Sequence, residues 1–128
     1  MNERRKQPRK DLMSYSQVFE LYGGKLIGYL GDLNVSGAMV IGNDSIEVDR
    51  TMTISIQLPE LPEVKATRLA LPARVAWCHQ DLSPDYFNIG LEFSLVTDDQ
   101  KMVIEAVMEN YEFRRQSPKY PPHPTEIE

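Results

Sequence analysis

Apolar and polar residues alternate along most of the chain, which is the pattern of β-strands with one buried and one exposed face. The alternation is clearest over residues 51–58, whose apolar members share one face: Met52, Ile54, Ile56 and Leu58. The opposite face of the same segment carries threonine, serine and glutamine. This segment is therefore predicted to be a strand that lies against a hydrophobic core.

The same pattern predicts five further strands, over residues 13–22, 25–33, 36–41, 68–78 and 87–93. Gly23-Gly24 separates the first two of these segments and is a hairpin signal. Within residues 68–78, one face is expected to hold Leu69, Leu71, Ala73, Val75 and Trp77. Six strands joined by short turns are typical of a small antiparallel barrel or sandwich.

The period changes after residue 96, where the sequence predicts a helix. Thr97-Asp98-Asp99-Gln100 has the order of a capping box with acids in the first turn, which the helix dipole favours. Helical spacing then relates Val103, Ile104, Val107, Met108 and Tyr111. With Arg114 and Arg115 as cations at its end, the helix is expected over residues 96–115, covering an open end or edge of the sheet. A proline-rich tail is expected over residues 116–128.

Composition limits the class of protein. The chain has 128 residues, 41% of them hydrophobic, as expected of one domain with a single core. No apolar run approaches the ~20 residues of a membrane helix, and no apolar stretch follows the charged N-terminus as in a signal peptide. The lone Cys78 cannot form an internal disulfide. These features predict no membrane insertion and a reducing, cytoplasmic location.

Positive charge is concentrated at the N-terminus. Residues 1–10 hold five Lys or Arg and one acid, so they carry +4, and because the chain carries −5 the remainder carries −9. Binding of DNA or RNA needs a broad basic surface, so a small, compact anion is the better match. The guanidinium groups of Arg5 and Arg9 can each grip a phosphate or a guanine edge. Residues 1–12 are therefore interpreted as a flexible basic ligand-binding arm on a barrel formed by residues 13–95.

A second polar group lies where one predicted strand ends and the next begins. Asp32 and Asn34 are two residues apart, so in an extended chain their side chains point the same way. A carboxylate can accept hydrogen bonds from guanine, and an amide can both donate and accept. Gly37 permits either a close backbone approach or a positive φ. The alternative is that Asp32 and Asn34 only form a turn.

These two segments together resemble the PilZ family, whose pattern is R-x-x-x-R followed by [D/N]-x-S-x-x-G. Residues 5–9, Arg-Lys-Gln-Pro-Arg, match the first motif, and residues 32–37 match the second except that Asn34 replaces serine. Ala-Arg-Val-Ala-Trp at residues 73–77 and Asn-Ile-Gly-Leu-Glu-Phe at residues 88–93 also resemble the family. The resemblance covers residues 4–112. It implies an all-β fold, a six-stranded antiparallel β-barrel, with a C-terminal helix.

The resemblance also implies a ligand, cyclic di-GMP, and a set of residues that bind it. Arg5 and Arg9 of the first motif would hold phosphates and guanine edges. Asp32, Asn34 and Gly37 of the second motif would line the surface beneath a base. Arg4 matches a family position that favours a stacked ligand dimer, which implies two ligand molecules per chain. Trp77 is either a residue of the core or its rim, or a platform for a base. The expected binding residues are Arg4, Arg5, Arg9, Asp32, Asn34, Gly37 and Trp77.

The expected function is that of a stand-alone PilZ domain which binds cyclic di-GMP and signals to an unknown protein partner by ordering its arm. The alternative is a degenerate PilZ domain that works as a protein-interaction adaptor without nucleotide, which the replacement at Asn34 favours. No nucleophile–base pair or catalytic carboxylate pair is present in the sequence, so no enzyme is expected. Cys78-His79 has no further ligand cluster beside it, so neither a metal site nor a cofactor is expected.

Overall fold

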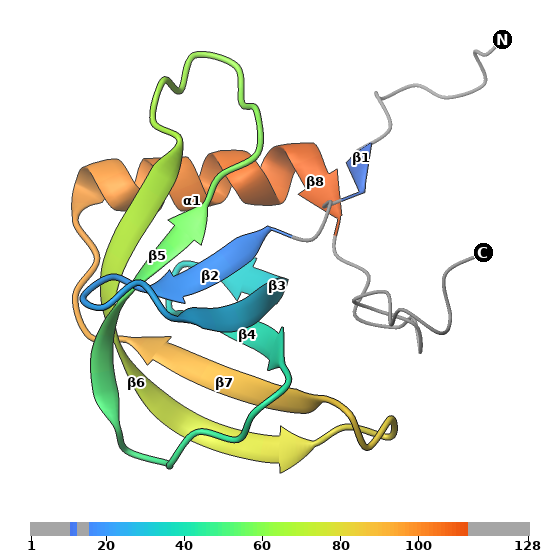
Figure 1. Cartoon of the computed structure of the whole chain (residues 1–128). Coiled ribbons are helices and arrows are strands. Elements are labelled where there is room, and N and C mark those ends of the chain that lie inside the picture. Colours follow the sequence, from blue (N-terminus) through green and yellow to red (C-terminus); the bar gives the residue numbers. More distant parts are fainter. Residues whose placement is uncertain (1–10, 13–15, 113–128) are drawn as a thin grey trace, which may run out of the picture.

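The computed structural model describes residues 11–12 and 16–112. Six strands close into a barrel in which each neighbouring pair is antiparallel (Figure 1). The order around the barrel is β2-β3-β4-β7-β6-β5. The strands are β2 (Gln17–Glu20), β3 (Leu26–Asn34), β4 (Gly37–Gly42), β5 (Thr51–Gln57), β6 (Arg68–Gln80) and β7 (Phe87–Phe93). The predicted six-stranded antiparallel barrel is thus confirmed.

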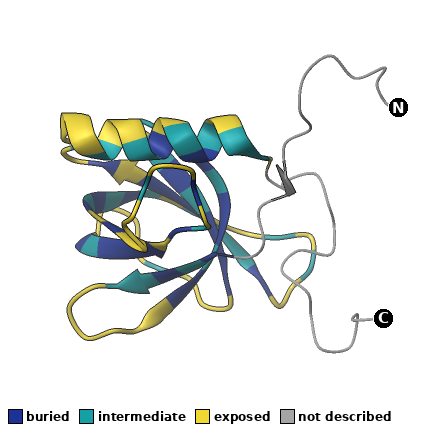
Figure 2. Ribbon diagram, turned by 90° about the horizontal axis from the view of Figure 1, so that it is seen from above, coloured by how far each residue is buried: buried dark blue, intermediate teal, exposed yellow. Residues whose placement is uncertain are grey.

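The inward faces of these strands form one hydrophobic core (Figure 2). The four apolar residues predicted to share a face of β5 and the residue after it are all buried: Met52, Ile54, Ile56 and Leu58. Burial of each such side chain contributes roughly 1.5–3 kcal/mol. The period-two pattern therefore predicted these core positions of β5, although Ser55 on its polar face is buried as well.

The helix α1 (Asp98–Asn110) begins as predicted and packs on the barrel (Figure 1). Thr97 and Gln100 form the predicted capping box: the Thr97 hydroxyl accepts from the backbone N–H of Gln100, and the Gln100 side chain accepts from that of Thr97. Ile104 and Val107 are completely buried and belong to the barrel core. The helix consequently completes the core rather than standing apart from it.

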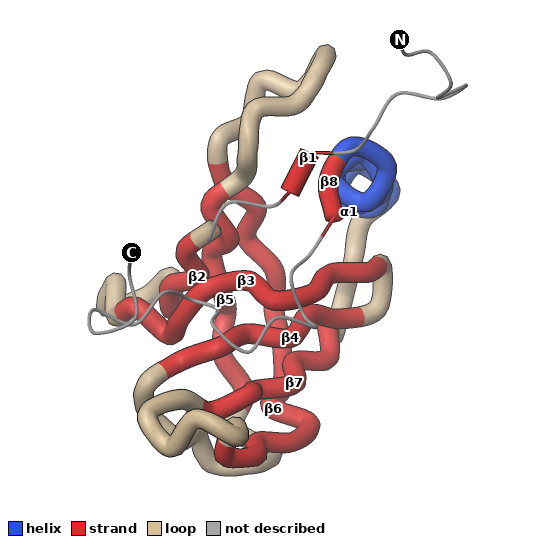
Figure 3. Tube along the Cα trace, turned by 90° about the vertical axis from the view of Figure 1, so that its right-hand side faces the viewer, coloured by secondary structure: helices blue, strands red, loops and turns tan. Residues whose placement is uncertain are grey.

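The helix ends at Asn110, earlier than the predicted residue 115. Tyr111 has extended backbone angles, φ −136° and ψ 149°, and opens the short strand β8 (Tyr111–Glu112). The Tyr111 hydroxyl donates to the carbonyl oxygen of Glu60 at 2.7 Å, which holds the chain in this path. β8 pairs in parallel with β1 (Asp11–Leu12), beside the end of α1 (Figure 3). Arg114, Arg115 and the proline-rich tail lie outside the described residues.

The predicted hairpin at Gly23-Gly24 is present, with a longer loop than the two glycines. β2 ends at Glu20 and β3 begins at Leu26. The loop closes through a hydrogen bond of 2.8 Å from the Glu20 N–H to the Lys25 carbonyl oxygen. Gly23 and Gly24 have φ of 104° and 72°, a region that costs side-chain-bearing residues about 1–2 kcal/mol. Glycine is therefore the favoured residue at both positions of this turn.

Candidate ligand-binding groove

An open groove of about 350 Å³ lies on the outer surface of β3, β4, β7 and β6, which are consecutive around the barrel. Four of the residues proposed from the sequence line it: Asp32, Asn34, Gly37 and Trp77. The remaining lining residues are Leu33, Ser36, Ala38, Met39, Arg74, Ala76, Gly90, Leu91 and Glu92. The structure therefore brings together candidate residues that are far apart in the sequence.

Strand register arranges the groove as two rows that cross all four strands. One row runs through paired residues in the order Asp32, Met39, Gly90 and Trp77. The next row runs in the order Asn34, Gly37, Glu92 and Arg74. Each row has a polar side chain from β3 at one end and a large side chain from β6 at the other.

Two irregularities in strand pairing lie beside Asp32 and Trp77, the residues at the two ends of the first row. In β3 the register shifts between Leu30 and Asp32, and the partly buried Asp32 lines the groove although its neighbour Leu33 belongs to the core. In β6 the register shifts between Val75 and Trp77. Extra residues of this kind re-aim the side chains beside them. Both register shifts therefore lie next to residues that line the groove.

The prediction that Trp77 shares the core face of β6 was wrong. Its side chain is 38% exposed, whereas Val75 is completely buried. Because the register shifts between them, the period-two alternation does not continue to Trp77, and Cys78 packs against the core instead. Trp77 lies at the rim, where its ring is accessible to a ligand.

Gly90 provides the surface on which the Trp77 ring lies. A Cβ atom added to Gly90 would stand 2.1 Å from the Cε2 atom of Trp77, so only glycine allows the ring this close to β7. The sequence interpretation did not assign Gly90 to the site. A glycine in the middle of a strand is the signal that was available, since it marks close approach by another group.

Asn34 is exposed in the groove and also forms the turn between β3 and β4. Its Oδ1 accepts from the Ser36 N–H at 2.8 Å, from the Ser36 hydroxyl at 2.8 Å and from the Gly37 N–H at 3.0 Å. The turn-forming alternative is thus correct for the oxygen of Asn34. The amide nitrogen is the part of this side chain that a ligand could use, and it donates rather than accepts.

We expect Asn34→Ala to destabilise the protein by about 1–2 kcal/mol, because three donors lose their acceptor at a partly solvated turn. Asn34→Ser should recover part of this loss, since a serine oxygen can accept in a similar turn, though more weakly. Urea unfolding of the two variants and the wild type measures both effects. Equal stability of the Asn34→Ala variant and the wild type would show that the turn does not depend on Oδ1.

Gly37 is required for space, not for a positive φ. Gly23 and Gly24 are the glycines with positive φ in the described part of the chain. A Cβ atom on Gly37 would lie 2.3 Å from the carbonyl oxygen of Leu91 in β7. Of the two roles considered from the sequence, close backbone approach is the one that the structure supports.

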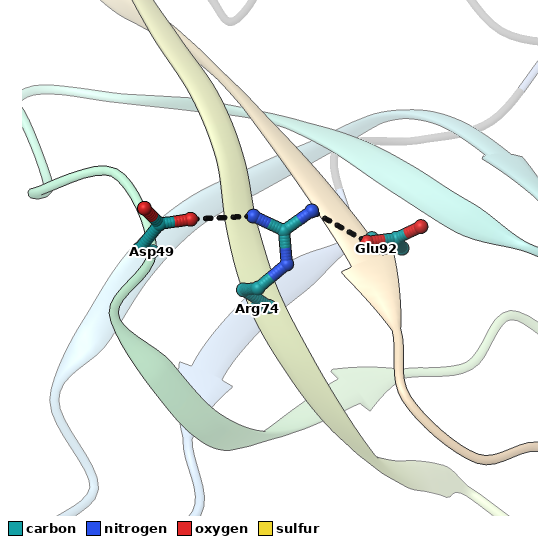
Figure 4. A network of polar contacts seen from close by, with 3 residues as sticks. All are labelled: Asp49, Arg74 and Glu92. Atoms are coloured by element: carbon teal, nitrogen blue, oxygen red, sulfur yellow. Dashed lines mark hydrogen bonds and ion pairs between the residues drawn. The ribbon is translucent and has the colours of Figure 1, made fainter.

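Arg74 was not assigned to the site from the sequence, yet it lines the groove and joins two acidic side chains (Figure 4). Its Nη1 donates to Oδ1 of Asp49 and its Nη2 donates to Oε1 of Glu92, both at 2.6 Å. Hydrogen bonds to Glu92 and then to Asp49 raise the pKa of Arg74 above its usual value, so the guanidinium stays charged.

The described groove has no surplus positive charge of its own. Asp32, Arg74 and Glu92 are its charged lining residues, and their formal charges give −1. Arg4, Arg5 and Arg9 lie outside the described residues, so the structure does not place them. Among residues 11–12 and 16–112 no group of three or more His, Cys, Asp or Glu side chains could hold a metal ion. Within the same residues, no helix has both the length and the apolar character needed to span a membrane.

Comparisons with known proteins agree with this fold. The family model of the PilZ domain matches residues 3–110. The PilZ domain of YcgR from Escherichia coli, solved with c-di-GMP, superposes with a TM-score of 0.55 at 11% identity, covering 84% of this chain and 90% of that one. The Bacillus subtilis inhibitor of motility (MotI/DgrA) superposes with a TM-score of 0.59 at 17% identity over 80% of this chain. The chain spans about half of the Bacillus protein, 51%. No curated protein matches the sequence.

Proposed function

The chain belongs to the PilZ domain family, and from this membership we propose that it binds cyclic di-GMP in the groove of β3, β4, β7 and β6. PilZ domains are nucleotide-binding regulatory domains, so the chain is not an enzyme. The observation that carries the proposal is the shared groove: Asp32, Asn34, Gly37 and Trp77 were selected from sequence motifs, and all four line it.

Each part of the groove has a chemical role in this proposal. Trp77 offers an exposed ring on which a guanine base can stack. The Asp32 carboxylate can accept from the N1–H and N2–H₂ groups of that base. Arg5 and Arg9 supply the surplus positive charge that two phosphates require, because the lining of the groove carries a formal charge of −1.

The proposed output is a change of surface that a protein partner reads. The bound nucleotide would draw the basic arm onto the groove, and ordering a segment is an established way to switch a binding surface. The proposed location is the cytoplasm, where a second messenger is available. The partner would be a protein rather than DNA or RNA, since residues outside the arm are strongly acidic in total.

A second candidate is an adaptor that binds a protein without nucleotide. The turn contacts of Asn34 favour it, because Oδ1 is already satisfied where the family motif has serine.

Calorimetric titration with cyclic di-GMP separates the candidates, with cyclic di-AMP as the control that lacks the guanine donors. Binding of the guanine compound alone supports the receptor. If neither compound gives a heat of binding and neither changes the melting temperature, the adaptor is supported. A bound ligand at 100 times its Kd would stabilise the protein by about 2.7 kcal/mol and so raise the melting temperature.

The same titration tests the stoichiometry that Arg4 predicts. A stacked pair of ligands brings four phosphates and four bases, and a third guanidinium beside Arg5 and Arg9 can contact a phosphate or stack on a base. We expect two ligands per wild-type chain and a shift toward one in Arg4→Leu. The protein concentration must lie well above Kd so that the equivalence point is sharp. An equivalence point at one ligand per wild-type chain would reject the stacked pair.

A further inference from the structure

Among the described lining residues, Arg74 is the one cation of the groove, and a carboxylate of the same groove already holds it. Glu92 contacts Nη2 of Arg74 from the neighbouring strand β7, and the two residues are register partners. Asp49 contacts Nη1 from the other side. Asp49 precedes β5 and is not among the lining residues, whereas Arg74 and Glu92 both are.

The ion pair between Arg74 and Glu92 is open to solvent. The Arg74 side chain is 38% exposed and that of Glu92 is 59% exposed. Exposed pairs contribute little net stability, because water and dissolved ions screen both partners. An incoming phosphate can therefore replace the carboxylate at small cost, since the released Glu92 side chain is hydrated again.

We propose that Glu92 is a built-in competitor for the anionic group of the ligand at Arg74. In the free protein Glu92 accepts from Nη2 of Arg74, and on binding a phosphate oxygen accepts in its place. Arg74 stays protonated throughout, so the exchange involves no proton transfer. This inference rests on the proposed function, which supplies the phosphate. It assigns Arg74 to ligand binding and makes Glu92 a residue that lowers affinity.

The test compares two variants that remove the same charge and the same kind of contact. Glu92→Gln and Asp49→Asn each neutralise one carboxylate that accepts from Arg74, but only residue 92 lies in the groove. We expect Glu92→Gln to lower Kd for cyclic di-GMP about three- to tenfold, and Asp49→Asn to change it less than about twofold. Calorimetric titration at one ionic strength measures both values.

A third comparison links the effect to Arg74 itself. In an Arg74→Gln background the added Glu92→Gln change should improve Kd no more than Asp49→Asn does in the wild type. The exchange would be refuted if Glu92→Gln and Asp49→Asn lowered Kd equally, or if Glu92→Gln lowered Kd just as much in the Arg74→Gln background. Either result would point to a general effect of charge on binding. A lower melting temperature of Glu92→Gln with unchanged Kd would assign the pair to strand pairing alone. Absence of binding by the wild type and by Glu92→Gln would instead refute the proposed function, and this inference with it.

Discussion

Replacing Arg5 or Arg9 by alanine is expected to weaken cyclic di-GMP binding about ten- to a hundredfold each, because a hydrogen bond to a charged group contributes roughly 1.5–3 kcal/mol. The groove makes this expectation stronger than the motif alone does. Its formal charge of −1 means that the groove cannot balance the charge of two phosphates by itself, so further cations must come from another part of the chain. Titration calorimetry of both variants provides the measurement.

The melting temperature of the ligand-free protein should stay the same in both variants, since residues 1–10 contain one apolar residue, Met1, and add little to the core. Lys6→Ala is the matched control: it removes one positive charge from the arm at a position outside the R-x-x-x-R motif. Its effect should be much smaller than that of either arginine. Near wild-type affinity in Arg5→Ala and Arg9→Ala would sink the assignment of these residues to the site.

Gly37→Ala is expected to cost about 2–3 kcal/mol of unfolding free energy, in the range measured for overpacked sites. The added methyl group would lie 2.3 Å from the Leu91 carbonyl oxygen. That oxygen is part of the backbone of β7, so β4 and β7 must separate beneath the groove. A decrease of roughly 10 °C in Tm follows for a domain of this size.

Gly24→Asn is a suitable comparison for Gly37→Ala. Gly24 has a φ of 72° with no atom within 4 Å of an added Cβ, and asparagine tolerates this conformation. Urea unfolding should therefore give a clearly smaller loss of stability for Gly24→Asn than for Gly37→Ala. Equal stability of the two variants would mean that the strands accommodate the methyl group without separating.

Local patterns account for the parts of the fold that the sequence predicted correctly. Alternation within the strand accounts for β5 and the first part of β6, an apolar run accounts for β4, and the start of α1 follows from the Thr97 capping box. The end of α1 was misplaced because β8 depends on its pairing with β1, which no local period encodes. A two-residue strand is too short to show alternation at all.

The sequence identified several residues that line the groove, but not the direction in which all of their side chains point. The motif at Asp32, Asn34 and Gly37 identified one side of the groove. The outward position of Trp77 depends on the register between β6 and β7, so alternation within β6 gave the wrong face. The contact between Arg74 and Glu92 joins residues 18 positions apart and likewise depends on that register. Side chains that meet only through strand pairing cannot be paired from one sequence.

In the proposed function the basic arm is an intramolecular partner of the groove, and the pairing of β1 with β8 is the point to which the arm is tethered. Asp11 is held beside Tyr111, and Arg5 stands six residues before Asp11. An extended chain spans at most about 3.3–3.6 Å per residue, so Arg5 stays within roughly 20 Å of a fixed point. A tether of this kind gives an effective concentration in the millimolar range when the length of the arm matches the distance between its anchor and the ligand. On this proposal the contribution of the arm to affinity is independent of protein concentration, and extra residues inserted after Arg9 should lower the local concentration of the arm and weaken binding.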